Sequence, residues 1–338
     1  MIIEMAKDAT EEQINNVVDR AGHLGLEVQL NRGTQKTVVA LLGSDTGKIT
    51  TESFAVLPGV ESVSRIMKPY KLASREIHPE NSKIKVDGIE IGGQRVVVMA
   101  GPCAIENEAQ LLDTAKAVKK SGATVVRGGA FKPRTSPFSF QGLEEAGVEI
   151  LGKVRDNAGI PVITEVVDPQ HIGLLAKHAD ILQVGARNMQ NFVLLKELSK
   201  VRHPIVLKRG FSATVTEWLT AADYLLSQGN QQVILCERGI RTFEDSTRFS
   251  IDIGSIGVVK HYSHLPIIID PSHAAGHYAF VPSIAKAAIA AGADGLLIEV
   301  HPNPEDALVD GLQSLTLSNF DLLMNELKAI ALAVGRYI

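Results

Sequence analysis

The sequence lacks any long apolar segment. No uninterrupted apolar run approaches the roughly 20 residues that a membrane-spanning helix needs. The opening residues, Met1 to Asp8, include acidic side chains where a secretory signal would be basic, and no long apolar stretch follows them. We therefore expect neither a membrane protein nor a secreted one.

Cysteine is also scarce, and positive charge is not in excess. Cys103 and Cys236 are the only cysteines and lie far apart, which argues against a disulfide framework and favours the reducing cytoplasm. The formal net charge of -4 leaves no overall basic field that would hold nucleic acid or an anionic membrane. Any anion site must therefore be local.

The length of 338 residues suits one large α/β barrel with an extra module, or two ordinary domains. Residues 1–69 have the strand and helix order of a ferredoxin-like domain. Its expected pieces, with helices in second and fifth place, are Ile2–Met5, Thr10–Leu24, Leu26–Leu30, Thr37–Leu42, Ile49–Val56 and Val60–Ile66. Residues 70–94 are expected to form a linker ending in a hairpin, whose strands Lys83–Val86 and Ile89–Ile91 flank an Asp-Gly turn.

Short β-branched runs alternate with longer amphipathic segments over residues 95–338. Repeating at about 30 residues, they predict a (β/α)₈ TIM barrel. The expected strands are Val96–Ala100, Thr124–Arg127, Pro161–Glu165, Ile181–Val184, Pro204–Lys208, Gln232–Cys236, Leu265–Asp270 and Gly295–Val300. A doubly wound open sheet is the alternative, but the first strand leads into Ala100-Gly101-Pro102-Cys103 and not into the glycine fingerprint of that fold.

Potential metal ligands recur where the expected strands end, and these ends meet at one mouth of a barrel. Cys103, His273 and Glu299 come from strands one, seven and eight, and Asp310 lies in the loop that follows. One thiolate, one imidazole and two carboxylates suit a divalent ion such as Mn²⁺, Fe²⁺, Co²⁺, Zn²⁺ or Cu²⁺. Their spacing matches no short zinc motif; singly, Cys103 also fits a buried hydrophobe and Asp310 a turn residue. His301 is a competing imidazole at the same end.

Cations gather at the same predicted mouth. The run from Gly128 to Ser136 places glycines, two cations and two hydroxyls directly after a strand, a pattern typical of phosphate binding. The candidate cations are Arg127, Lys132, Arg134, Arg187, Lys208, Arg209, Arg238 and Arg241. Because one phosphate needs fewer cations, we expect two anionic substrates, although any one arginine also fits a surface charge or an ion pair. Lys208 ends an apolar strand and is a candidate proton carrier, and Glu165 is expected to stay ionised unless it is buried.

Seven motifs, in order along the chain, carry a resemblance to a known family. They are Ala100-Gly101-Pro102-Cys103, Arg127-Gly128-Gly129, Lys132-Pro133-Arg134-Thr135-Ser136, Gly185-Ala186-Arg187-Asn188, Leu207-Lys208-Arg209-Gly210, Cys236-Glu237-Arg238-Gly239 and Asp270-Pro271-Ser272-His273. The sequence resembles the type I beta branch of the 3-deoxy-D-arabino-heptulosonate 7-phosphate (DAHP) synthases, the first enzymes of the shikimate pathway. The resemblance implies a metal-dependent condensation of phosphoenolpyruvate with erythrose 4-phosphate and water.

The resemblance also implies roles for individual residues. Phosphoenolpyruvate would be held by Arg127, Lys132, the Ala186 backbone, Arg187, Lys208 and Arg238, and erythrose 4-phosphate by Arg134 and Thr135. The metal would be bound by Cys103, His273, Glu299 and Asp310. Lys132 is expected to act as general acid, with Lys208 as the alternative, and Glu165 to orient cations or water. The family further implies a homotetramer, and an amino-terminal domain that binds tyrosine or phenylalanine between subunits for feedback inhibition.

Three other functions stay open at this point. The sister enzyme 3-deoxy-manno-octulosonate 8-phosphate synthase uses arabinose 5-phosphate and shares the barrel; Arg134-Thr135 favours the four-carbon acceptor over it. A non-catalytic sugar-phosphate sensor that acts through its ferredoxin-like domain is the second alternative. Separately, the amino-terminal domain could serve only assembly or stability and not regulation. An aldolase that forms a Schiff base on Lys208 is the third.

Overall fold

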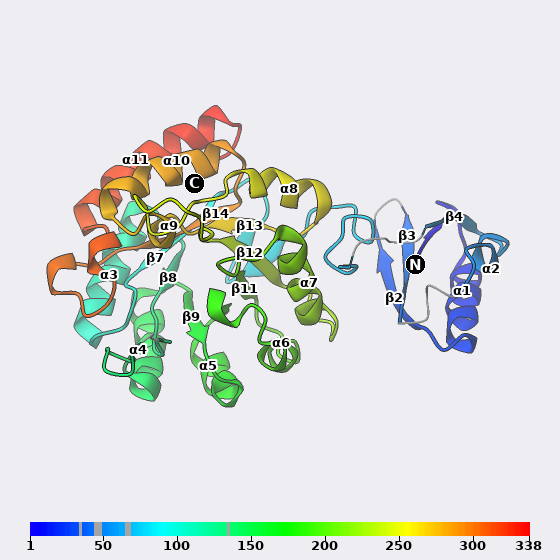
Figure 1. The fold of residues 1–338 in the computed structure, drawn as a ribbon, viewed down its shortest axis with the longest axis horizontal. Helices are drawn as coiled ribbons and strands as arrows, with labels where there is room; N and C mark the ends of the chain where they lie inside the picture. The colour runs from blue at the N-terminus through cyan, green and yellow to red at the C-terminus, as the bar shows by residue number, and fades with distance from the viewer. Residues whose placement is uncertain (34–35, 44–48, 65–68, 134–135) are drawn as a thin grey trace. The chain divides into compact units, whose positions relative to one another are not determined.

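The structure is a computed structural model that describes residues 1–33, 36–43, 49–64, 69–133 and 136–338 (Figure 1). The chain forms two compact units. The first comprises Met1–Asn81 and His261–His264, and the second comprises Ser82–Lys260 and Leu265–Ile338. Among the described residues, no helix has both the length and the apolar character that crossing a membrane requires.

The amino-terminal unit contains an antiparallel sheet in the order β2-β3-β1-β4. Its elements are β1 Ile2–Met5, α1 Glu11–His23, β2 Glu27–Arg32, β3 Thr37–Leu42, α2 Glu52–Ala55 and β4 Val60–Ser64. This is the predicted ferredoxin-like order. Helix α2 is shorter than predicted, mainly because it begins at Glu52 and not at Ile49; Pro58 and Gly59 limit its other end, since neither residue continues a helix well. Residues 65 and 66 of the last predicted strand lie outside the described part of the chain.

The second unit is a closed barrel of parallel strands in the order β10-β11-β12-β13-β14-β7-β8-β9. The strands are β7 Val97–Gly101, β8 Val125–Arg127, β9 Val162–Val166, β10 Ile181–Val184, β11 Ile205–Lys208, β12 Val233–Glu237, β13 Ile267–Ile269 and β14 Gly295–Glu299. Gly295 of β14 pairs with Val97 of β7 and so closes the barrel. The predicted TIM barrel is therefore confirmed, and the open doubly wound sheet is excluded.

Helices follow the barrel strands and lie around the barrel (Figure 1). They are α3 Glu108–Ser121, α4 Glu144–Ala158, α5 Ile172–His178, α6 Phe192–Leu198, α7 Val215–Leu226, α8 Gly254–Tyr262, α9 Pro271–Ala275, α10 Val281–Ala290 and α11 Leu317–Ala333. Short 3₁₀ turns at Pro169–His171, Ala186–Asn188, Tyr278–Phe280, Pro304–Asp306 and Gly311–Gln313 lie in the loops. Buried apolar faces such as Leu111, Ala115 and Val118 of α3 explain why these helices pack on the strands.

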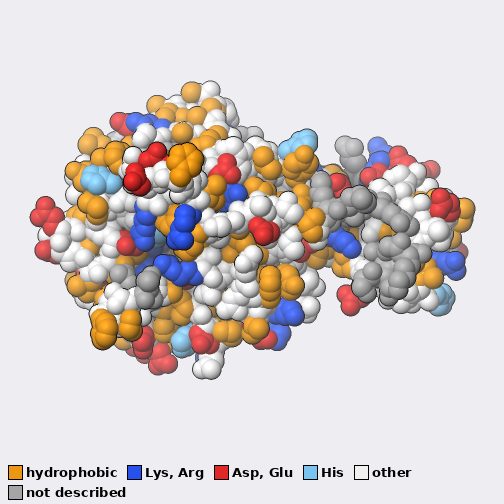
Figure 2. All heavy atoms as spheres, viewed as in Figure 1, with side chains coloured by type: hydrophobic (Ala, Val, Ile, Leu, Met, Phe, Trp, Pro, Cys, Tyr) orange, Lys and Arg blue, Asp and Glu red, His pale blue; other side chains and the backbone are white. Residues whose placement is uncertain are grey.

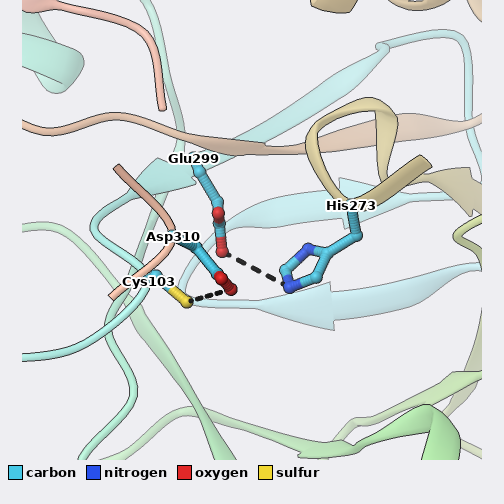
Figure 3. Close-up of side chains that lie close together, drawn as sticks. All are labelled: Cys103, His273, Glu299 and Asp310. Atoms are coloured by element: carbon cyan, nitrogen blue, oxygen red, sulfur yellow. Dashed lines mark hydrogen bonds and ion pairs between the residues drawn. The ribbon is translucent and has the colours of Figure 1, made fainter. Parts of the chain in front are cut away.

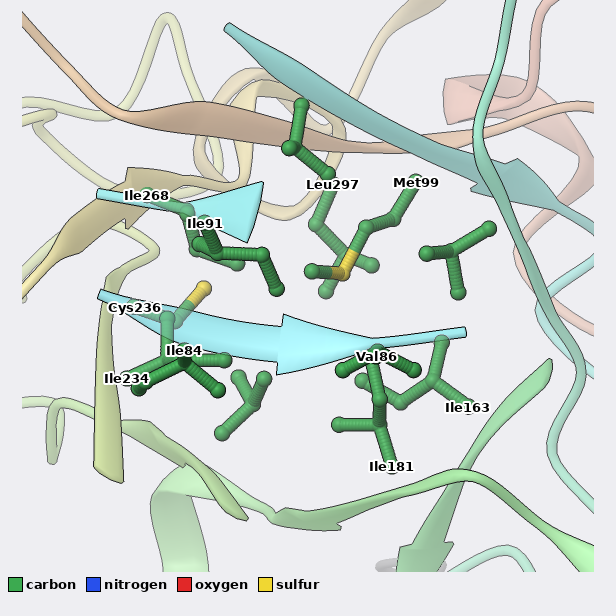
Figure 4. Packing of buried hydrophobic residues seen from close by; sticks show 13 residues of the cluster. Ile84, Val86, Ile91, Met99, Ile163, Ile181, Ile234, Cys236, Ile268 and Leu297 are labelled. Atoms are coloured by element: carbon green, nitrogen blue, oxygen red, sulfur yellow. The ribbon is translucent and has the colours of Figure 1, made fainter. Parts of the chain in front are cut away.

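A hairpin precedes the barrel and fills one end of it. Strands β5 Ile84–Val86 and β6 Ile89–Ile91 pair antiparallel across Asp87 and Gly88, whose φ angles are 45° and 79°. Positive φ at both turn residues is the geometry of a tight hairpin turn. Figure 4 shows three hairpin side chains among the apolar residues of the barrel interior: Ile84, Val86 and Ile91. The opposite, carboxyl ends of the strands are left for polar groups.

Candidate active site

Charged side chains surround a cavity of about 240 Å³ at the carboxyl ends of the barrel strands. The predicted site residues that line it are Lys132, Glu165, Ala186, Arg187, Lys208, Arg238, His273 and Asp310. In Figure 2 lysine and arginine side chains gather around this hollow on the barrel. The barrel thus brings together residues from loops that are far apart in the sequence.

Four potential metal ligands form one cluster beside this cavity. One ligand atom each from Cys103, His273, Glu299 and Asp310 lies within 4.8 Å of the others. Cys103 Sγ donates to Asp310 Oδ2 at 3.3 Å, and His273 Nε2 lies 3.5 Å from Glu299 Oε1 (Figure 3). His301 is outside the cluster, where its Nε2 is 3.5 Å from Glu106 Oε1. The two competing imidazoles are therefore separated by the fold.

Backbone geometry brings the four ligands together. Gly101 ends β7 where an added Cβ would meet the carbonyl oxygen of Arg127, so only glycine allows the close approach that leads into Cys103. Asp310 has a φ of 52°, a strained value for a non-glycine residue. Glu106 accepts a hydrogen bond from the Leu308 N–H at 2.8 Å and so ties the Asp310 loop to the segment after Cys103.

The ligands differ in charge before any ion binds. Burial opposes the ionised form of Glu299, but His273 and Arg127 outweigh it and lower the pKa of Glu299 to about 2. Burial and the nearby Glu299 carboxylate raise the pKa of the Cys103 thiol. Burial lowers the pKa of His273, which favours the neutral imidazole that a metal requires. This donor set fits a first-row divalent ion.

Two of the candidate cations, Arg127 just before the predicted phosphate run and Lys132 within it, contact the ligand cluster directly. Arg127 Nη1 donates to Glu299 Oε1 at 2.6 Å, and Lys132 Nζ donates to Cys103 Sγ at 3.2 Å. Although burial opposes it, the neighbouring Cys103 sulfur and the Glu165 carboxylate raise the pKa of Lys132. Lys132 is therefore a charged donor between the cluster and the cavity.

The other wall of the cavity holds arginines on aromatic rings. The Arg238 guanidinium lies 4.0 Å from the Phe249 ring centroid and 4.8 Å from that of Phe211, and Arg187 lies 5.4 Å from Phe211. Burial lowers the pKa of Arg238 to about 10. Cation–π contacts of this kind fix an arginine while leaving its N–H groups to a ligand.

The aromatic residues and Arg248 were not among the residues predicted from the sequence. Arg248 Nη1 donates to Gln313 Oε1 at 2.9 Å, and Gln313 Nε2 donates to Glu299 Oε2 at 2.6 Å. A signal did exist, since Phe211 directly follows Lys208-Arg209-Gly210 and Arg248-Phe249 lies in the loop after Arg238.

Glu165 and Ala186 line the cavity from neighbouring strands β9 and β10. Gln183 Nε2 donates to Glu165 Oε2 at 3.2 Å. An added Cβ at Gly185 would collide with Glu165 Oε1, so the glycine leaves room for the carboxylate in the position seen here. Ala186 begins the 3₁₀ turn after Gly185, which brings its backbone to the cavity.

Some predicted residues are placed elsewhere. Arg209 points away from the cavity, where its Nη1 donates to Glu237 Oε2 and Asp252 Oδ2, each at 2.8 Å. Cys236 is part of the apolar barrel interior. Arg241 does not line the cavity. Arg134 and Thr135 lie outside the described residues.

Lys208 pairs with Asp270, a residue that was not predicted from the sequence to belong to the site. Its Nζ donates to Asp270 Oδ2 at 2.5 Å, and His273 Nδ1 lies 2.8 Å from the same oxygen. Asp270 is completely buried. Burial opposes its ionised form, but the neighbouring His273 imidazole and the Lys208 ammonium group hold the pKa of Asp270 well below its usual range.

Comparisons with known proteins agree over both units. A model described as the DAHP synthetase I family matches residues 76–333, and a model of the DAHP synthase ferredoxin-like domain matches residues 1–68. The chain is 45% identical over 335 residues to a phospho-2-dehydro-3-deoxyheptonate aldolase of Thermotoga maritima, with 99% of both chains covered. It is 34% identical to a 2-dehydro-3-deoxyphosphooctonate aldolase of Geobacter sulfurreducens, over 73% of this chain and 97% of that relative.

Solved structures give the same result. The crystal structure of the Thermotoga maritima DAHP synthase matches with a TM-score of 0.80 and 44% identity, covering 99% of this chain and 98% of that one. A truncated form from the same organism matches with a TM-score of 0.75 and 42% identity, over 80% of this chain and 99% of that one.

Proposed function

The chain belongs to the DAHP synthetase I family, and on that premise we propose that it condenses phosphoenolpyruvate with erythrose 4-phosphate and water. The products are 3-deoxy-D-arabino-heptulosonate 7-phosphate and inorganic phosphate. The observation that carries this proposal is the cavity itself, which has a four-ligand cluster on one side and stacked arginines on the other. Two anionic substrates fit such a cavity better than one.

Phosphoenolpyruvate is bound by cations that the barrel holds in place. Lys132, Arg187, Lys208 and Arg238 line the cavity, and the Ala186 backbone lies among them. Arg127, buried against Glu299, lines a smaller cavity that also contains Lys132 and Glu165, and it is a further phosphoenolpyruvate ligand in this proposal. Because these cations are fixed before substrate arrives, they stabilise developing negative charge without reorganising.

The ligand cluster would hold one divalent ion through Cys103, His273, Glu299 and Asp310. When bound, such an ion supplies Lewis acidity toward a carbonyl oxygen.

The residues of the chain then divide the bond changes among them. The methylene carbon of phosphoenolpyruvate forms a bond to the aldehyde carbon of erythrose 4-phosphate, and Lys132 donates a proton to the aldehyde oxygen. Water, oriented by Glu165, adds to the carbon that bears the phosphate, and the proton it loses restores Lys132. The hemiketal phosphate then breaks its carbon–oxygen bond to give the ketone, and the released phosphate takes the hydroxyl proton. Lys208 stays a binding cation and alternative acid, and no covalent adduct forms on it.

The acceptor is tested by a direct comparison. Phosphate release is measured with phosphoenolpyruvate and either erythrose 4-phosphate or arabinose 5-phosphate, in the presence of Mn²⁺. We expect turnover with the four-carbon sugar at least about 100-fold faster, as kcat/KM, because loss of a site's polar contacts to an acceptor is costly. Equal or faster turnover with arabinose 5-phosphate would favour an octulosonate synthase. The absence of turnover with either sugar would favour a non-catalytic sensor.

Two further measurements examine the chemistry. A chelator should abolish phosphate release, and restoring each of the five candidate ions in turn should identify those that support it. Borohydride added with both substrates should leave the mass of the protein unchanged; a stable adduct on Lys208 would point to Schiff-base chemistry instead.

We also propose that the amino-terminal unit is a regulatory domain that binds tyrosine or phenylalanine between subunits of a homotetramer in the cytoplasm. The match of residues 1–68 to the ferredoxin-like domain of DAHP synthases supports this proposal. Each amino acid is added to the full chain and to a chain without residues 1–69. Inhibition should appear only in the full chain, and equal inhibition of both would leave the domain a role in assembly or stability alone.

A further inference from the structure

Asp270 contacts one residue of the cavity, Lys208, and one residue of the ligand cluster, His273, but it belongs to neither set itself. It directly follows β13, is completely buried, and is absent from the lining of the cavity. Its Oδ1 accepts the His273 backbone N–H at 2.9 Å and so caps α9. Its Oδ2 lies 2.5 Å from Lys208 Nζ and 2.8 Å from His273 Nδ1. One oxygen atom is therefore shared by an ammonium group and an imidazole.

The two partners of this oxygen face different ligands. Lys208 lines the cavity that we assign to phosphoenolpyruvate. His273 turns its other nitrogen, Nε2, toward Glu299 within the ligand cluster (Figure 3). Histidines that bind a metal through one nitrogen commonly present the other to a carboxylate, which orients the ring. Asp270 has that position here, and on its other side it contacts Lys208, the cation that we assign to substrate binding.

The shared charge links the two sites. Without an ion, the Asp270 carboxylate is divided between the Lys208 ammonium and His273. A cation held by the imidazole would make the ring more positive, so the carboxylate 2.8 Å from Nδ1 would be drawn toward the ring and more of the Lys208 charge would be left for an anion. By reciprocity, an anion on Lys208 leaves more of the carboxylate for His273 and its ion.

We propose that Asp270 is a positioning residue that couples the divalent-ion site to the phosphoenolpyruvate site, so that each ligand tightens the binding of the other. The proposal rests on the proposed function, because it takes Lys208 to bind phosphoenolpyruvate. Asp270 itself contacts neither ligand.

The first experiment measures coupling without turnover. Phosphoenolpyruvate is titrated calorimetrically into the full chain, once with chelator and once with saturating Mn²⁺, and the ratio of the two Kd values is the coupling factor. Asp270→Asn keeps the size and the capping oxygen but removes the charge. Asp252→Asn is the matched control, since Asp252 also caps a helix start and pairs with a cation, Arg209 at 2.8 Å, away from the cluster.

We expect a coupling factor of about 5 or more in the unaltered protein, the lower end of typical coupling between sites. It should fall to about 2 or less in Asp270→Asn, where only the direct attraction between ion and anion remains, and should be unchanged in Asp252→Asn. A full coupling factor in Asp270→Asn would overturn the inference. Failure of the unaltered protein to bind phosphoenolpyruvate at all would instead overturn the proposed function and the inference with it.

A second experiment needs no phosphoenolpyruvate and covers the case in which Asp270→Asn does not fold. Mn²⁺ is titrated into Lys208→Met and into Arg187→Met, each of which removes one positive charge from the cavity wall. Only Lys208 contacts Asp270. Lys208→Met should therefore bind Mn²⁺ at least about threefold more tightly than Arg187→Met, because the loss of Lys208 leaves the whole Asp270 carboxylate to His273 and its ion. Equal Mn²⁺ affinities in the two variants would refute the role of Asp270.

Discussion

At the amino ends of the barrel strands Ile84, Val86 and Ile91 of the hairpin pack on apolar side chains, whereas at the carboxyl ends buried charges face one another. The same strands thus support two environments. Apolar packing stabilises without directional demands. A buried ion pair such as Arg127–Glu299 loses hydration and as a whole adds little net stability compared with apolar packing, although neutralising one partner alone is costly; such pairs hold reactive groups in position. Stability and chemistry are therefore assigned to opposite ends of one barrel, and substitutions should separate them.

The largest separation is expected from Lys132→Met. The variant removes the general acid that contacts Cys103 Sγ and lines the cavity, so kcat should fall by about 10²- to 10⁴-fold. The free energy of unfolding, measured by denaturant titration, should change far less than the activation free energy of the reaction does. A variant that keeps more than a tenth of the normal kcat would remove Lys132 from the chemistry.

The opposite result is expected at the hairpin. Ile91 is completely buried, and Ile91→Ala should lower the free energy of unfolding by about 2–5 kcal/mol through lost burial and a residual cavity. The affinities for Mn²⁺ and phosphoenolpyruvate should stay unchanged. Ile89→Ala is the matched control, because Ile89 is only partly buried and should cost less. Weakened Mn²⁺ binding in Ile91→Ala would show that the two ends are not independent.

The pH dependence of stability should separate the two ends as well. The folded-state pKa of Glu299, about 2, lies below its ordinary value of 4.5. The metal-free protein therefore has about 3 kcal/mol of stability from this group above pH 4.5, and loses it as the pH falls through 4.5 toward 2. Glu299→Gln should not show this part of the stability loss at acid pH, whereas Ile91→Ala should still show it. Identical acid unfolding curves for wild type and Glu299→Gln would contradict the assignment.

The smallest effect is expected from Phe249→Leu. Losing the ring under Arg238 should weaken phosphoenolpyruvate binding by about 1 kcal/mol, or roughly fivefold in Kd. Phe243→Leu, a fully exposed position in the same loop, should leave the Kd unchanged. Equal Kd values for the two variants would mean that the ring does not position Arg238.

The fold and the family were predictable because each rests on local patterns. Alternating β-branched runs fixed the strands to within a residue or two, and ordered motifs identified the DAHP synthase family; both predictions are confirmed. Side-chain alternation along a strand also explains why Arg209 points away from the cavity when Lys208 points into it. That signal was present in the sequence.

Contacts between distant segments were not predictable in the same way. Asp270 meets Lys208 across a barrel in which their strands are not neighbours, and Phe249 meets Arg238 through the path of a loop. Neither pairing leaves a periodic mark in the sequence. The roles of Arg134 and Thr135 stay predictions.

The hairpin that fills the barrel also bears on the order in which the chain is completed. During synthesis Ile84, Val86 and Ile91 leave the ribosome before any barrel strand, yet Ile268 and Leu297, in the same apolar cluster, come from the last two strands. The hairpin therefore cannot bury its apolar side chains completely until the last strands have been made, a condition that favours aggregation. We expect a chaperone that shields short apolar segments to engage this protein early, and to be released only when β14 closes against β7.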